Sequence, residues 1–192
     1  MKEKDTIKKT MNKSKNFTRR RLSAEEIRDS LLAAGGNLDL SPGGPHPFPA
    51  APTWGFSQHA PFNAVYETDR RSAYLMVQRQ RRHPYLALFD GADPNSSTGV
   101  RDTTTVPTQA LYFLNDSFFH KQAADFAQNV LQESAKNGRL EKAFAQLLQR
   151  QPVAIEKEMA AQFLEQYPGN LQEKWAAYAR VLLASNEFLY VD

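Results

Sequence analysis

The sequence contains no cysteine among its 192 residues. This absence excludes disulfides, thiolate metal sites, thiol nucleophiles and covalent haem attachment through a C-x-x-C-H motif. No apolar run approaches the ~20 residues that a membrane-spanning helix needs, so we predict no membrane span. The glycine-rich loops that bind phosphates and the Gly-x-Ser-x-Gly turn of serine hydrolases are also absent. We therefore predict no bound cofactor.

Basic charge is concentrated at the N-terminus. Residues 1–21 hold nine of the 24 basic residues and two of the 21 acidic ones, so the remaining residues carry a net charge of −4. Nucleic-acid binding needs a clustered basic face, so we predict none for the folded part. We expect residues 1–18 to form a disordered basic tail, with binding of the tail to polyanions as the alternative. No apolar segment follows the lysines, so this stretch is not a secretory signal peptide.

The first helix is predicted over residues 22–34. Ser23 and Glu26 match a capping box, and Leu22 with Ile27 matches a hydrophobic staple. Two glycines then end the helix. A Pro/Gly-rich loop with several aromatic residues follows up to residue 62, and its prolines exclude regular structure.

The rest of the chain is predicted to be mostly helical. Residues 72–78 form the one plausible strand, buried on both faces, with a short buried helix as the alternative. A helical turn follows Pro84, and from residue 105 onward about four or five helices form a C-terminal bundle, with Asp116 as one N-cap. We expect residues 186–192 to dock rather than fray. The predicted fold class is mainly α, with a long loop and at most one or two short strands.

The polar stretch at residues 83–115 is the candidate site, together with arginines that flank residues 72–78. The functional interpretation is a clamp for an anionic ligand, because arginine binds carboxylate or phosphate with two parallel hydrogen bonds. The structural interpretation, which we favour, pairs these arginines with Asp90, Asp93 and Asp102 and fixes the loop. The full set of candidates is Asp90, Asp93, Asn95, Arg101, Asp102, Arg70, Arg71, Arg79 and Arg82.

Metal binding is not indicated by the residue spacing. The four histidines are scattered at positions 46, 59, 83 and 120, and we interpret His83 as a turn residue. Residues 93–97 alternate oxygen-bearing side chains as a calcium loop does, but the following glycine comes one place late, and we favour an Asp-Pro-Asn turn. Aromatic residues between Trp54 and Tyr66 could stack on a sugar ring, although core packing is the favoured interpretation.

Four motifs resemble a known family. They are RRRLSAEEIRDSLLAAGGNLD, RRSAYLMVQR, LFDGADPNSSTGVRDTTTVPTQALYFLND and LLASNEFLYVD. Together they resemble the C-terminal domain of unknown function of large secreted planctomycete proteins, which commonly follows a planctomycete-type cytochrome c-like domain. One departure is Gln149, where relatives usually have a glycine that ends a helix.

The resemblance implies a partial domain over residues 19–192. It consists of a capped helix and loop at 19–71, then an extended segment and helical bundle at 72–192. It also implies a secreted or envelope-associated protein whose upstream domains are the natural partners, and an exposed apolar patch where a missing segment would pack.

Two functions remain open. The favoured one is a non-catalytic accessory or interaction domain. The alternative is a fragment of an enzyme acting on an extracellular substrate such as polysaccharide, with its remaining site residues upstream.

Overall fold

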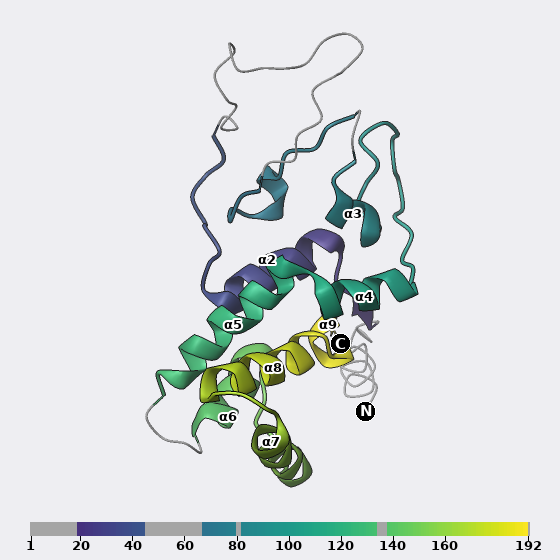
Figure 1. The fold of residues 1–192 in the computed structure, drawn as a ribbon. Coiled ribbons are helices and arrows are strands. Elements are labelled where there is room, and N and C mark those ends of the chain that lie inside the picture. The colour runs from purple at the N-terminus through teal and green to yellow at the C-terminus, as the bar shows by residue number, and fades with distance from the viewer. Residues whose placement is uncertain (1–18, 45–66, 80–81, 134–137, 192) are drawn as a thin grey trace, which may run out of the picture.

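The computed structural model describes residues 19–44, 67–79, 82–133 and 138–191 (Figure 1). The predicted basic tail at residues 1–18 and the aromatic loop at 45–66, which includes His46, Trp54 and His59, lie outside these residues. In chain order the described residues form β1 (Arg20–Arg21), α2 (Ala24–Gly35), the 3₁₀ helix η2 (Ser72–Tyr74), α3 (Pro84–Leu88), α4 (Pro107–Asn115), α5 (Ser117–Leu131), α6 (Gly138–Leu147), α7 (Ala154–Gln166), α8 (Leu171–Leu183), α9 (Asn186–Leu189) and β2 (Tyr190–Val191).

The prediction of a mainly α fold is confirmed. The described residues contain one sheet, made of two short strands. Among them, no helix is both long and apolar enough to cross a membrane.

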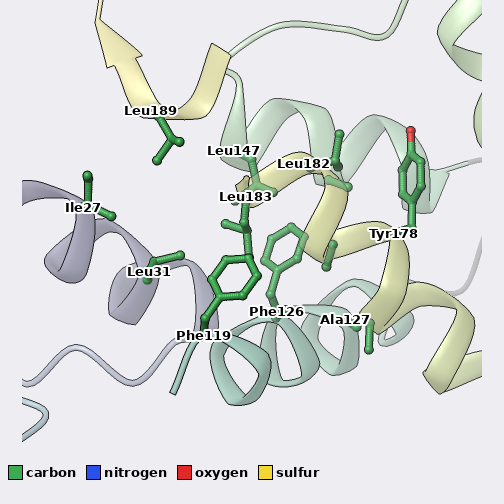
Figure 2. Close-up of a cluster of buried hydrophobic side chains, with 14 of the residues drawn as sticks. Ile27, Leu31, Phe119, Phe126, Ala127, Leu147, Tyr178, Leu182, Leu183 and Leu189 are labelled. Carbon is green, nitrogen blue, oxygen red and sulfur yellow. The ribbon is translucent and has the colours of Figure 1, made fainter. Parts of the chain in front are cut away.

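Helix α5 is the centre of the core. It lies beside α8 on one side and α2 on the other (Figure 1). The buried side chains of α5 recur every three to four residues, which is the spacing of a helix that packs one face on a core. Figure 2 shows Phe119 and Phe126 of α5 meeting Leu183 of α8 and Leu31 of α2. All four side chains are at most 1% exposed, so this contact closes the core.

The first helix begins as predicted. The Ser23 hydroxyl accepts a hydrogen bond from the Glu26 N–H at 3.3 Å, and Glu26 accepts one from the Ser23 N–H at 2.8 Å. Both bonds satisfy backbone donors that a helix start leaves unpaired. The helix ends at Gly36, whose φ of 77° is a left-handed conformation that glycine adopts without steric cost.

Aromatic rings connect α3 and α4 to α5. The ring centroids of Tyr85 and Phe89 are 5.0 Å apart, and Phe89 lies 5.2 Å from Tyr112. Phe113 then meets Phe119 of the core at 5.0 Å. These edge-to-face and tilted pairs are favourable ring geometries, so they extend the core to the region around the candidate site.

The predicted strand at residues 72–78 is wrong. Residues Ser72–Tyr74 form η2, and the side chains of Tyr74 and Val77 are 41% and 46% exposed. The Ser72 N–H donates to the Asp29 carboxylate of α2 at 2.7 Å. The Leu75 N–H donates to the Ser72 carbonyl, which closes a turn in place of a ladder.

The C-terminal segment docks as predicted. Strands β1 and β2 pair antiparallel, and the Leu22 N–H donates to the Leu189 carbonyl at 2.9 Å. Arg150 connects α9 to α7, because it forms ion pairs of 2.6 Å with Glu156 of α7 and 2.5 Å with Glu187 of α9. Residues 186–191 are therefore part of the fold.

We expect Gln149→Gly to stabilise the protein by about 1 kcal/mol. Gln149 has a φ of 56°, so it adopts the left-handed conformation that favours glycine. This conformation costs a residue with a Cβ about 1–2 kcal/mol, part of which the greater backbone entropy of glycine offsets. Urea unfolding of the wild type, Gln149→Gly and Gln149→Ala measures the effect. A glycine variant no more stable than the alanine variant would contradict it.

We expect Glu26→Gln to lose stability at neutral pH but not in acid. Hydrogen bonds from the Arg20 side chain and the Ser23 N–H lower the pKa of Glu26 from 4.5 to about 2. A carboxylate with a lowered folded-state pKa stabilises the fold above its unfolded pKa and loses this effect as the pH falls towards the folded value. The stability difference between the wild type and the variant should therefore shrink between pH 4.5 and pH 2.

The measurement is urea unfolding of both proteins across this pH range. The pair is partly exposed, so the difference at pH 7 should be modest. Glu158→Gln is the control, because Glu158 is exposed and forms no ion pair among the described residues. A difference that persists unchanged at pH 2 would rule out this role of the charge.

Candidate functional site

The predicted polar stretch forms a loop between α3 and α4, and Asp90 closes it. The Asp90 carboxylate accepts hydrogen bonds from the Thr104 N–H at 2.8 Å and from the Thr104 hydroxyl at 2.9 Å. Asp90 has a φ of 59°, a left-handed conformation that Asp tolerates better than most residues. The adjacent Gly91 N–H donates to the Leu86 carbonyl at 2.7 Å. These contacts join the two ends of the loop next to the end of α3.

The middle of the loop is a turn. The Asp93 side chain accepts from the Asn95 N–H at 2.8 Å, as the Asp-Pro-Asn interpretation predicts. The Asn95 side chain then donates to the Arg79 carbonyl at 2.9 Å. In the part of the chain that the structure describes, no three His, Asp or Glu side chains converge to hold a metal ion.

The arginines do not pair as predicted. Arg70 pairs with Asp39 at 3.5 Å, and Arg71 with Asp29 of α2 at 3.9 Å. The Arg82 side chain donates to the Gly91 carbonyl. None of the candidate arginines forms an ion pair with Asp90, Asp93 or Asp102 within the described residues, so the prediction of an Arg–Asp network in the loop is wrong. The nearer carboxylates are Asp29 in α2 and Asp39 shortly after it, and the local sequence around the arginines does not reveal this proximity.

Arg101 ties the loop to the first helix. It donates to the Glu25 carboxylate at 2.6 Å, across 76 positions in the sequence. Burial acts to raise the pKa of Glu25, but the hydrogen bonds from Arg101, Ser23 and its own backbone, with the charge of Arg101, together outweigh burial, and the pKa is lowered. Glu25 lies in the first turn of α2, where a negative charge is also favoured by the helix dipole. Arg101 is therefore a structural contact in this conformation.

A polar pocket of about 290 Å³ is lined in part by the predicted site residues. Its lining includes the hydroxyl residues Ser96 and Thr98 and five of the predicted residues, which are Arg82, Asp90, Asp93, Arg101 and Asp102. Arg70, Arg71, Arg79 and Asn95 do not line it. Asp90 and Arg101 are already engaged in the fold, so the pocket can offer a polar contact surface but shows no base held against a nucleophile.

A second pocket of about 390 Å³ was not predicted. It lies where α2, α3 and the α4–α5 junction meet, and its lining is Arg28, Glu67, His83, Pro84, Tyr85, Leu88, Tyr112, Asp116 and Phe118. His83 is 6% exposed, and neither ring nitrogen has a hydrogen-bond partner. The interpretation of His83 as a simple turn residue is incomplete. It is the N-cap of α3, and it is buried because α3 packs on α2.

Burial is the largest cause of the pKa shifts of His83, Tyr85 and Tyr112, which line this second pocket. It lowers the pKa of His83, an effect that nearby Glu67 opposes and Arg28 reinforces, so the imidazole is favoured in its neutral form. The pKa of Tyr112 is raised, first by burial and then by the charge of Asp116. The pKa of Tyr85 is raised by burial as well, and its hydroxyl donates to the Ala24 carbonyl at 2.8 Å. Both phenols therefore stay protonated at neutral pH.

We expect Asp90→Ala to destabilise the protein by about 1–2 kcal/mol, because it removes two hydrogen bonds to a charged acceptor and places alanine at a positive φ. The amide of Thr104 should also exchange faster with solvent. Asp93→Ala is the matched control and should cost less than about 0.5 kcal/mol, because its bond is local and exposed. Equal effects from both variants in urea unfolding and hydrogen exchange would argue against the role of Asp90.

Comparison with known proteins identifies the family of the chain. No curated protein and no solved structure matches the chain. The family model that matches is PSD1, described as a protein of unknown function (DUF1553), and it covers residues 2–164. The matched span includes the basic N-terminal segment, both pockets and most of α7, and it stops before α8. Because it covers more than half of the chain, this protein belongs to the PSD1 family of unknown function (DUF1553).

Proposed function

We propose that this chain is a non-catalytic interaction domain of a secreted or envelope-associated multidomain protein. The observation that carries the proposal is an exposed apolar face at α7. Val153, Ile155 and Met159 are 55%, 59% and 62% exposed, which is far more than a residue facing the core. Ile155 and Met159 are four residues apart, so they lie side by side on the helix.

The apolar surface of α7 extends beyond the side that packs on the core. The packed side contacts the core through Ala160, with Phe163 and Leu164 partly buried beside it. Ile155 and Met159 extend this surface towards the start of the helix, where no described element covers them. A helix that faces the core on one side normally carries polar residues on the other. Clustered exposed apolar side chains of this kind favour a contact with another protein surface.

Ion pairs fix which side of α7 faces outward. Lys157 pairs with Glu141 of α6 at 2.6 Å, and Glu156 pairs with Arg150 at 2.6 Å. Both pairs hold α7 against neighbouring elements, so the helix cannot rotate to bury Ile155 and Met159 without breaking them. The exposed face is thus available to a partner with an apolar surface.

The contacts in the loop support a non-catalytic role. Asp90, Arg101, Arg70 and Arg71 all have partners within the fold. A catalytic pair needs a nucleophile or acid held within reach of a base. The charged groups of the loop are instead used to hold α2, η2 and the loop together.

The partner we propose is the adjacent domain of the same polypeptide. This part of the proposal, like secretion, is supported by the resemblance to the C-terminal domains of large secreted proteins. An apolar contact of this kind is typical of domains that pack within one chain.

We expect Ile155→Gln/Met159→Gln to weaken binding to that domain at least tenfold, because both side chains would lose burial at the contact. The segment encoded in frame upstream of residue 1 is produced separately, and its affinity is measured by titration calorimetry. Leu111→Gln/Leu114→Gln is the matched control, since this pair on α4 is 53% and 66% exposed. Glutamine keeps helix propensity at all four positions.

Three results would overturn the proposal. The first is the absence of an in-frame upstream segment, and the second is binding that the α7 variant leaves unchanged. The third is hydrolysis of polysaccharide by the chain alone, which would favour the enzyme alternative.

A further inference from the structure

We propose that the pocket between α2, α3 and the α4–α5 junction binds an uncharged, ring-sized organic molecule that hydrogen-bonds to His83. The pocket measures about 390 Å³, within the range of small-molecule sites. Its walls include Pro84, Leu88 and Phe118, with the rings of Tyr85 and Tyr112 beside them. Apolar and aromatic walls of this kind suit a flat ring.

His83 supplies the polar contact. The residue is 94% buried, and both of its ring nitrogens are covered and have no partner. Such groups are rare in folded proteins because each unpaired buried donor or acceptor is costly. The proposal requires the imidazole to turn a nitrogen towards the pocket that it lines, and no hydrogen bond opposes this rotation. A ligand bonded to that nitrogen would satisfy a buried polar atom that has no partner within the fold.

The neutral imidazole selects the ligand's polar group. One ring nitrogen donates a hydrogen bond and the other accepts one. A hydroxyl or an amide can serve either nitrogen, because each of these groups both donates and accepts. A purely donating ammonium or a purely accepting carboxylate can serve only one of the two.

Arg28 does not provide an anion site. Its guanidinium donates to the Arg70 carbonyl at 3.1 Å, to the Ser72 hydroxyl at 3.3 Å and to the Thr68 carbonyl. It also lies over the Phe118 ring, 5.4 Å from the centroid. These contacts use the donors that would otherwise clamp a carboxylate.

The two carboxylates of the pocket do not create a cation site either. Asp116 caps α5 by accepting from the Phe119 N–H at 3.1 Å. Glu67 is exposed, so solvent screens its charge. With Arg28 balancing one of these charges, an uncharged ligand fits best.

This site is independent of the proposed contact at α7. Helices α3 and α7 lie at opposite ends of the molecule (Figure 1). Loss of one site should leave the other intact, so the failure of either proposal can be recognised separately.

The test uses benzamide, with benzoate and benzylamine as its charged analogues. Binding is followed by NMR of the His83 ring nitrogens in the full chain. We expect benzamide to bind with a millimolar Kd, as a fragment of its size does, and to shift the His83 signals. Benzoate and benzylamine should bind at least tenfold more weakly. Preferential binding of either charged analogue would overturn the proposed ligand class.

Variants separate ligand binding from a purely structural role. His83→Leu should weaken benzamide binding at least tenfold and raise Tm by about 2–4 °C, because unpaired nitrogens are removed. His120→Leu is the control: Nε2 of His120 is also buried without a partner, but His120 does not line the pocket. Its Tm should rise and its benzamide affinity should not change.

A second variant covers the case in which His83→Leu does not fold. Leu88→Trp fills the pocket and keeps the imidazole, and it should also abolish binding. Benzamide binding that survives either substitution, or no response of the His83 signals at 10-fold excess over the expected Kd, would overturn the site.

Discussion

The packing of α5 between α2 and α8 is the contact on which the rest of the structure depends. Phe119 and Phe126 are buried from both sides, and burying a large side chain contributes about 1.5–3 kcal/mol. The aromatic chain from Tyr85 to Phe119 then places α3 and α4, which in turn carry the loop and both sides of the His83 pocket. The family match ends at residue 164, and α8, which follows it, packs on α5 and contributes buried residues to the same core.

Local signals in the sequence predicted the local structure well. The Ser23–Glu26 capping box and the Asp116 cap are each satisfied within a few residues, so a single sequence is enough to find them. The prediction of a strand at residues 72–78 is wrong because distant residues, not local ones, determine the conformation there. This conformation is set by Asp29 and Arg28, more than 40 residues away, which replace a strand partner with side-chain contacts.

The same distinction applies to the candidate site. Asp93 forms the turn contact that the Asp-Pro-Asn sequence predicts, whereas Asp90 accepts hydrogen bonds from Thr104 in place of an arginine. Five of the nine candidates line one pocket. The ion pairs could not be predicted, because Arg101 and Glu25 meet only when α2 lies beside the loop. The sequence indicates that His83 lies in a turn before a proline, but it does not indicate that the side chain is buried. Its burial depends on three elements that are separate in sequence, so no local pattern indicates it.

We expect the face of α7 with Ile155 and Met159 to be covered by an adjacent domain in the intact protein. Hydrogen exchange tests this directly, with the isolated chain compared with the same chain inside its parent polypeptide. Exchange across α7 should be slower in the parent, with α2 and α5 unchanged because their residues are already buried. Identical exchange of α7 in both proteins would show that no adjacent domain covers this face.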